Sequence, residues 1–212
     1  MNRTIISLLL ATSAQAATLL DVGPGGQIIL LSAPVGQKSA YASGFSLDQT
    51  YTNVSIEAML KSTATYPAGK AFLMREIGAN ATTSDELQNK IVNFQVVASL
   101  NSGSFQTIFS GLTLNAGSYY LVVETPVGAA AGAVGWATGT ALSTAPGVSL
   151  LGDYARTNPA AYAPSSDFSQ FTTTHLRMRV SGDAAVPEPA TLALTGLALL
   201  GVGLVRRRRP VN

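Results

Sequence analysis

Apolar and polar residues alternate through the central part of the chain, most regularly between Asn53 and Lys61. The apolar positions of this run are Val54, Ile56, Ala58 and Leu60. A period of two is typical of a β-strand with one buried face. We therefore expect these four residues to face a core. The residues expected on the outward side are Ser55, Glu57, Met59 and Lys61.

Two later runs show the same alternation. In the first, between Tyr119 and Thr125, the residues expected to be buried are Tyr119, Leu121 and Val123, with Tyr120 and Glu124 more exposed. In the second, between Thr172 and Val180, the inward residues are expected to be Leu176, Met178 and Val180, and the outward ones His175, Arg177 and Arg179.

Several other short apolar runs predict further strands between residues 17 and 183. They are Gln27–Ser32, Tyr41–Leu47, Lys70–Ile77, Lys90–Leu100, Gln106–Phe109, Ala133–Ala137 and Val148–Leu151. Turn residues separate these runs, one helical turn is expected near Ser84, and Gly128–Gly132 and Thr157–Ser169 are expected to be loops. Many short strands without a long helical pattern favour an all-β fold. We predict an antiparallel, jelly-roll-like β-sandwich for residues 17–183.

The first 16 residues have the pattern of a secretory signal peptide. Arg3 precedes a short apolar core, and Ala14-Gln15-Ala16 forms a small-x-small cleavage site. Ala14 and Ala16 are thus the predicted signal peptidase residues, with cleavage before Ala17. This predicts export of the rest of the chain through the secretion machinery.

The last segment, residues 184–212, has three consecutive parts. Pro187, Glu188 and Pro189 form a motif that the two prolines keep extended. The uncharged run Ala190–Val205 would reach roughly 24 Å as a helix, somewhat less than the roughly 30 Å of a bilayer core. The basic cluster that follows comprises Arg206, Arg207, Arg208 and Arg209. Arginines beside an apolar segment stay in the cytoplasm. We therefore predict a single transmembrane helix, with residues 17–183, the body of the protein, outside the cytoplasm.

This order of motif, apolar helix and basic cluster resembles the PEP-CTERM sorting signal of exported bacterial proteins. The resemblance implies recognition by an exosortase, a membrane-embedded protease or transpeptidase, and a cell-envelope or extracellular location. It also implies a structural or adhesive role in an exopolysaccharide or biofilm setting. A plain tail anchor that is never cut is the alternative reading of the same segment.

A second resemblance lies in the body. Phe45-Ser46-Leu47-Asp48, Tyr51-Thr52-Asn53-Val54 and the run from Phe109 to Val122 are similar to the choice-of-anchor domains that precede such tails. This resemblance implies a β-sandwich architecture and says little about activity.

Composition and charge narrow the function classes. Only 11% of the residues are charged, and the formal net charge is +2. Five of the 13 Lys and Arg but one of the 11 Asp and Glu lie in the terminal segments, which leaves the body at about −2. Such a body is not expected to bind nucleic acid. The absence of cysteine excludes disulfides and thiol chemistry.

The body offers few residues for catalysis, so we expect no enzyme activity, cofactor or metal. His175 is the single histidine, no G-x-S-x-G elbow accompanies it, and it is expected to be a surface residue. The carboxylates are scattered, and no calcium-loop motif is present. Trp136 is a candidate glycan contact, because exposed aromatic rings stack on sugars, and Tyr154 and Tyr162 are weaker candidates. A glycan-binding module is therefore the alternative function, and a glycan-active hydrolase the third.

Overall fold

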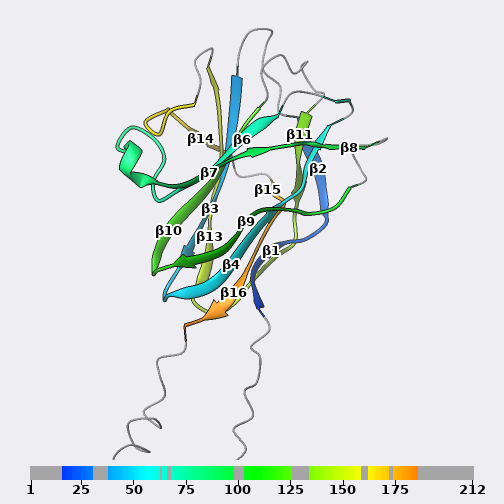
Figure 1. The fold of residues 1–212 in the computed structure, drawn as a ribbon. Coiled ribbons are helices and arrows are strands. Elements are labelled where there is room, and N and C mark those ends of the chain that lie inside the picture. Colours follow the sequence, from blue (N-terminus) through cyan, green and yellow to red (C-terminus); the bar gives the residue numbers. More distant parts are fainter. Residues whose placement is uncertain are drawn as a thin grey trace, which may run out of the picture.

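The computed structural model of the chain describes residues 16–30, 38–62, 64–65, 68–97, 103–125, 134–158, 162–171 and 174–185. These residues form β-sheets that are antiparallel except where Leu60–Ser62 pairs with Gln95–Val96 in parallel, and turns and one 3-10 turn, η1 (Thr83–Asp85), join the strands (Figure 1). The predicted all-β class and the helical turn near Ser84 are confirmed. The turn begins after Thr82, whose backbone N–H and side-chain hydroxyl both donate hydrogen bonds to Asp85 Oδ2, at 2.8 and 2.9 Å.

The largest sheet has six strands, all antiparallel to their neighbours. Their order is β14 (Ser169–Phe171), β13 (Val148–Asn158), β3 (Lys38–Leu47), β10 (Gly117–Glu124), β6 (Gly69–Met74) and β7 (Glu86–Val92). At its centre, Tyr119 of β10 pairs with Phe45 of β3, and the two rings stack at 5.6 Å. The sheet ends at β7, which pairs with β6 alone among the described strands.

A second sheet has five strands, and a smaller third sheet lies beside it. The second is ordered β12 (Leu142–Thr144), β1 (Ala17–Val22), β16 (Met178–Ala184), β4 (Tyr51–Ala58) and β9 (Gln106–Leu114). The third is ordered β15 (His175–Leu176), β11 (Val134–Gly139), β5 (Leu60–Ser62) and β8 (Gln95–Val96), and β2 (Gly25–Leu30) also pairs with β11.

All three sheets bury their apolar faces in one core. Side chains that are fully buried there include Phe45, Leu73 and Leu121 of the six-stranded sheet, Leu20, Ile56 and Val180 of the five-stranded sheet, and Leu60, Trp136 and Leu176 of the third. A core shared between sheets is what the predicted β-sandwich requires. Burial of this apolar surface is the main favourable contribution to folding.

The predicted core face of residues 54–60 is confirmed, because Val54, Ile56, Ala58 and Leu60 are all fully buried. The predicted exposure of Met59 and Lys61 is wrong, and Lys61 is only 3% exposed. The chain leaves the five-stranded sheet at Met59 and enters the third sheet at Leu60. Lys61 then lies between two strands, opposite Gly135 of β11 and Gln95 of β8, where neighbouring strands cover it.

The predicted core face of β10 is also confirmed, since Tyr119, Leu121 and Val123 are buried. Tyr120 is half-buried, and Glu124, expected to be more exposed, is only 4% exposed. Its carboxylate accepts a hydrogen bond from the backbone N–H of Tyr162 at 2.5 Å. The segment that contains Tyr162 thus lies over the outer face of β10. The alternation of residues within β10 could not predict this cover, because the covering segment is distant in the sequence.

Strand β13 is much longer than the predicted Val148–Leu151. It pairs with β3 from Val148 to Asn158, with one register shift between Leu150 and Gly152, and so extends into the expected loop. Gly152 has a φ of +137°, which a glycine adopts at little cost, and this permits the bulge. Buried polar residues such as Asp153 and Arg156 hide the strand from a search for apolar runs.

The two ends of the body leave it side by side. Strands β1 and β16 are antiparallel neighbours, with Ala17 opposite Gly182. Ala185 is held at the same end by its backbone N–H, which donates to Thr50 O at 3.0 Å. Figure 1 shows the start of β1 and the end of β16 at one pole, with the starts of β3 and β6 toward the other. Among the described residues, no helix is long and apolar enough to cross a membrane.

Candidate functional site

Most residues of the predicted targeting segments lie outside the described residues. This applies to Ala14, to Pro187, Glu188 and Pro189, and to Arg206, Arg207, Arg208 and Arg209. Ala16 is described and is exposed immediately before β1. The site that the structure itself can show is therefore on the body.

Trp136 lies in the core and not on the surface. Its side chain is 0% exposed, and its indole N–H donates to Arg177 O at 2.9 Å. It pairs with Leu60 and Ile29 on the two flanking strands. A sugar ring cannot stack on a buried indole, so the prediction of a glycan contact at Trp136 is wrong.

His175 is half-buried and contacts a buried carboxylate, which corrects its prediction as a plain surface residue. Its Nδ1 lies 3.0 Å from Asp153 Oδ2, and Asp153 is fully buried. Burial raises the pKa of the Asp153 carboxyl. Interactions with Ser43, with His175 and with the backbone of Leu176 lower this pKa, but burial has the larger effect. This contact joins β13 of the six-stranded sheet to β15 of the third sheet.

The Asp153–His175 pair has the geometry of two members of a catalytic triad, but the Ser43 hydroxyl beside it does not complete one. Ser43 lies opposite Asp153 on β3 and is fully buried, and its hydroxyl has no hydrogen bond of normal geometry. A triad needs a nucleophile that reaches both the histidine and the substrate. In the described parts of the chain, no three His, Asp or Glu side chains gather as metal ligands either.

The outer face of the six-stranded sheet carries an aromatic cluster. Its members are Phe72, Tyr120, Tyr154, Tyr162 and Phe168, packed over Ala40, Ala42, Met74 and Val122. Ring centroids are 4.8 Å apart for Phe72 and Tyr162, 6.1 Å for Tyr162 and Phe168, and 5.9 Å for Tyr120 and Tyr154. All five rings are half-buried, so the cluster is partly a second small core and partly a surface.

The segment 162–168 covers part of this face and is fixed by several hydrogen bonds. Besides the Tyr162 bond to Glu124, Gly78 N donates to Pro164 O at 3.3 Å and Ser166 N donates to Ala163 O at 2.9 Å. Burial, and secondarily the Glu86 carboxylate, raise the pKa of the Tyr162 phenol strongly. The phenol therefore stays protonated, and its hydroxyl is buried without a hydrogen-bond partner.

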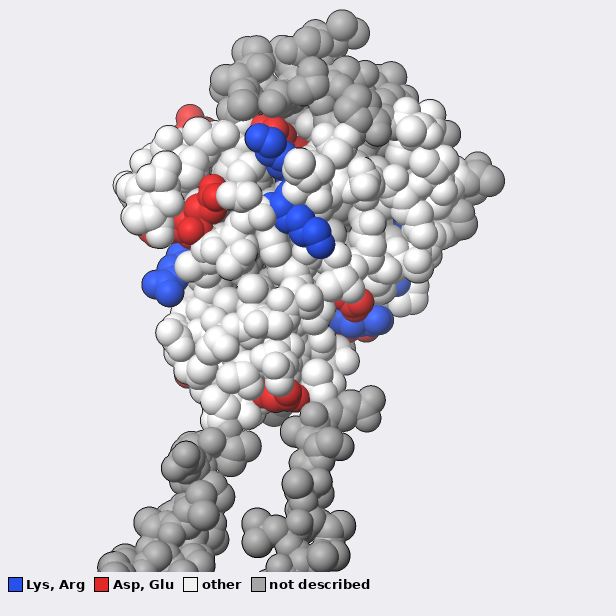
Figure 2. All heavy atoms as spheres, viewed as in Figure 1, with Lys and Arg blue, Asp and Glu red and all other residues white. Residues whose placement is uncertain are grey.

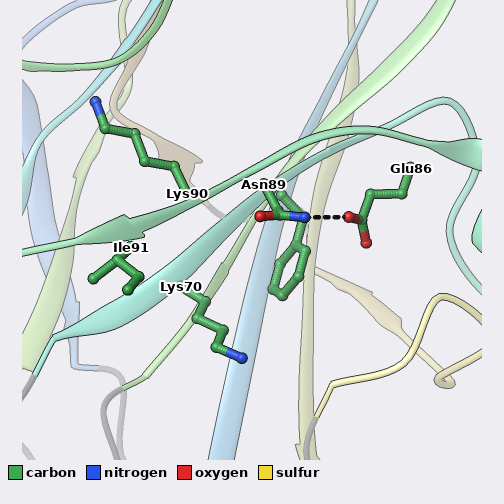
Figure 3. Close-up of a pocket in the computed structure, with 6 residues that line it drawn as sticks. Lys70, Glu86, Asn89, Lys90 and Ile91 are labelled. Atoms are coloured by element: carbon green, nitrogen blue, oxygen red, sulfur yellow. Dashed lines mark hydrogen bonds between the residues drawn. The ribbon is translucent and has the colours of Figure 1, made fainter.

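Next to this segment, a shallow hollow of about 190 Å³ opens between β6 and β7. It is lined by Lys70, Phe72, Glu86, Asn89, Lys90 and Ile91. Asn89 Nδ2 donates to Glu86 Oε1 at 2.6 Å, and Lys70 and Lys90 extend in opposite directions (Figure 3). Ile91 is 69% exposed, although it is a large apolar residue. The hollow combines apolar surface with polar groups, as ligand sites do.

Glu86 is the sole carboxylate that lines this hollow. Glycoside hydrolysis normally requires two carboxyl groups at a defined separation. The described lining offers an apolar wall, hydrogen-bonding groups and the side chains of two lysines.

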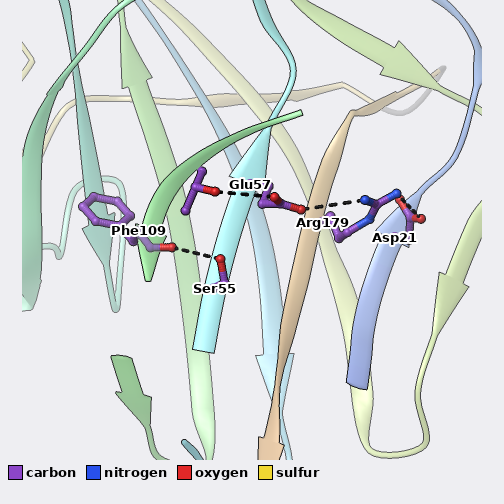
Figure 4. Close-up of polar contacts among 6 residues, drawn as sticks. Asp21, Ser55, Glu57, Phe109 and Arg179 are labelled. Carbon is purple, nitrogen blue, oxygen red and sulfur yellow. Dashed lines mark hydrogen bonds and ion pairs between the residues drawn. The ribbon is translucent and has the colours of Figure 1, made fainter. Parts of the chain in front are cut away.

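The outer face of the five-stranded sheet is polar and has a different character. Asp21, Arg179 and Glu57 are neighbours across β1, β16 and β4 (Figure 4). Arg179 lies 3.0 Å from the Asp21 carboxylate and 3.7 Å from that of Glu57. Partly exposed ion pairs of this kind contribute little stability, about 0–1 kcal/mol each. Figure 2 shows charges as small separate groups on a largely uncharged surface, without an extended basic area on the visible face.

The alternation of residues in β6 gave a signal for the aromatic face that the sequence interpretation did not use. Lys70, Phe72 and Met74 alternate with Ala71 and Leu73, which lie in the main core. That pattern places Phe72 on the outer face together with Lys70. Tyr154 and Tyr162, the two weaker candidates for sugar contact, lie on this partly exposed face, whereas Trp136 does not.

Comparison with known proteins identifies the C-terminal segment of the chain. No curated protein shows significant similarity to the chain. Residues 185–209 match the family described as the PEP-CTERM protein-sorting motif. The match confirms the sorting segment predicted from the sequence, and this motif implies processing by an exosortase, a membrane protease. The chain is thus an exported, envelope-associated protein that is sorted through a C-terminal signal.

Proposed function

We propose that this protein has a structural or adhesive role in an extracellular matrix, in an exopolysaccharide or biofilm setting. In this proposal, residues 1–16 are a signal peptide and residues 17–183 are a β-sandwich of the choice-of-anchor kind. Ala190–Val205 spans the membrane transiently, with Arg206–Arg209 in the cytoplasm, until an exosortase acts at Pro187-Glu188-Pro189.

The position of the chain ends is the observation that carries the proposal. The body ends at Ala185, beside the start of β1, and the sorting motif begins there. A tail at this pole holds the body by one end and presents the opposite end to the outside. The hollow between β6 and β7 lies toward that outer end, since β6 begins and β7 ends there (Figure 1).

We further propose that the body is not an enzyme. Two observations support this. In the described part of the chain, the Ser43 hydroxyl opposite Asp153 is buried, and Glu86 is the one carboxylate that lines the hollow between β6 and β7. Both arrangements lack a group that hydrolysis requires.

A glycan-binding module is the second candidate, and the aromatic cluster on the six-stranded sheet favours it. Aromatic rings beside hydrogen-bonding groups suit the apolar faces and hydroxyls of sugars. The two candidates are compatible, because binding a matrix polysaccharide is one way in which a protein becomes adhesive.

The test is a deletion in a bacterium that makes exopolysaccharide and carries an exosortase. We expect the deletion strain to form a less cohesive matrix and to release more polysaccharide into the medium. The wild-type gene should restore both. A variant in which residues 187–189 are all alanine should restore neither, although it is made in equal amount. An unchanged matrix in the deletion strain would contradict the proposed role.

A further inference from the structure

We propose that the hollow between β6 and β7 binds an acidic sugar residue of an extracellular polysaccharide. This inference rests on the proposed function and names the chemical class of its partner. It is carried by three features: a fixed apolar wall, an oriented polar pair, and two ammonium groups, that of Lys70 on the face of the hollow and that of Lys90 on the other face of β7.

The apolar wall is built by strand pairing. Lys70 lies opposite Ile91, and Phe72 lies opposite Asn89, so these four side chains share the outer face of the sheet. Phe72 is held in place by the Tyr162 ring at 4.8 Å. Ile91 remains exposed beside it. A sugar ring presents an apolar C–H face, which packs well against an aromatic ring and an aliphatic side chain.

The polar pair has a defined orientation. The hydrogen bond of 2.6 Å between Asn89 and Glu86 fixes both side chains (Figure 3). It uses one amide hydrogen and one carboxylate oxygen. The Asn89 carbonyl oxygen and the second Glu86 oxygen are left to accept hydrogen bonds from sugar hydroxyls. Such preorganised groups bind at a low entropic cost.

The charges select an acidic sugar. Lys70 and Lys90 are exposed, and neither forms an ion pair with a carboxylate among the described residues. Lys90 pairs with Ala71, a residue of the main core, so its ammonium group extends from the face of β7 opposite to that of Asn89 and Ile91. A uronic acid carboxylate in the hollow would complete a charge-assisted hydrogen bond, the stronger kind, with the Lys70 ammonium group. Because β7 is the edge strand of the six-stranded sheet among the described strands, Lys90 can contact a second carboxylate of a polymer that passes around this edge (Figure 3).

The size of the hollow limits the ligand. Its volume of about 190 Å³ is below the roughly 300–1,000 Å³ of pockets that enclose drug-sized ligands. We therefore infer that it holds one sugar unit, while the rest of the polymer lies outside. Weak single contacts become effective when many protein copies bind one chain.

The experiment measures binding of the full-length protein, in mild detergent, to polygalacturonate and to its fully methyl-esterified form. The two polymers share a backbone and differ in charge. We expect polygalacturonate to bind on the order of tenfold more tightly, with an affinity that falls as salt is added. Lys70→Gln and Lys90→Gln together should remove this preference. Asn89→Ala should weaken binding of both polymers.

Arg75→Gln is the matched control, because Arg75 is exposed just after β6 and does not line the hollow. It should leave the affinity within about twofold of wild type, whereas Lys70→Gln, which removes the same charge, should not. Equal losses for Arg75→Gln and Lys70→Gln would show general electrostatic attraction and overturn the site.

Two further outcomes separate this inference from the proposed function. Equal binding of the acidic and esterified polymers would overturn the acidic specificity and leave a matrix role standing. Binding of neither polymer would overturn the inference, while the deletion strain tests the matrix role independently. A normal matrix in the deletion strain, with intact polygalacturonate binding, would contradict the matrix role alone.

Discussion

At the residue scale, the buried Asp153 should make stability depend on pH. Burial raises the pKa of its carboxyl in the folded protein above the ordinary value of about 3.9 that applies in the unfolded chain. Below about pH 4 the carboxyl is protonated in both states. As the pH rises from there through the higher folded pKa, the unfolded chain loses this proton first, so stability falls and then stays lower.

Asp153→Asn should remove this loss of stability at higher pH, and the amide oxygen can still accept a hydrogen bond from His175. We expect its melting temperature, relative to wild type, to rise as the pH increases from about 4 to 7. Thermal unfolding of both proteins across this range measures the difference. A relative melting temperature that falls with pH would show that the carboxylate is stabilised, and not destabilised, by its surroundings.

A second residue-scale prediction concerns the core position Leu60. Leu60 is fully buried and lies opposite Trp136 on β11. Leu60→Ala should leave a cavity beside the indole and lower the unfolding free energy by about 2–5 kcal/mol. Gln88→Ala, on the exposed strand β7, should change it by less than about 0.5 kcal/mol. Urea unfolding followed by tryptophan fluorescence compares them, and equal losses would contradict the assigned burial.

At the element scale, β3 and β10 depend on a close contact between Gly44 and Tyr120. The two residues pair directly, and a Cβ at position 44 would lie 2.6 and 2.7 Å from atoms of the Tyr120 ring. Gly44→Ala should therefore displace the ring and cost about 1–3 kcal/mol. In a Tyr120→Ser background the same change should cost clearly less. A double-mutant cycle measures this coupling, and strictly additive losses would contradict it.

The strand faces were predictable wherever a strand keeps to one sheet, and not where the chain changes sheets. Alternation correctly placed Ile56 and Leu60 in the core, but it also placed Lys61 outside. The period of two continues through Met59, although the chain passes there from β4 into β5. Alternation describes neighbours along the chain and contains no information on which strands lie on either side.

The candidate site was less predictable for a related reason. Phe72 and Asn89 meet only because β6 and β7 pair in one register, and Tyr162 reaches Phe72 from a distant segment. The burial of Glu124 depends on the same segment. The sorting tail, in contrast, is a linear signal whose parts follow one another in the sequence, and it was predicted with its motif and order.

At the scale of the whole molecule, we predict that the body lies outside the cytoplasm and the arginine cluster inside. Positive charge beside an apolar segment resists translocation. Protease added to intact spheroplasts should digest the body and leave a cytoplasmic marker protein intact. A body that stays protected until the spheroplasts are lysed would contradict this orientation.

The final prediction concerns processing of the tail. Changing Pro187, Glu188 and Pro189 to alanine removes two prolines, which disfavour a helix, and puts residues that favour a helix in their place. We expect this variant to remain in the membrane fraction at its full mass after signal peptide removal. The wild-type protein should lose its tail and leave that fraction in a host that has an exosortase. Thr195→Ala, inside the apolar run, is the control and should be processed like wild type. Identical mature masses and fractionation for the triple variant and the wild type would show that these three residues are not what the protease reads.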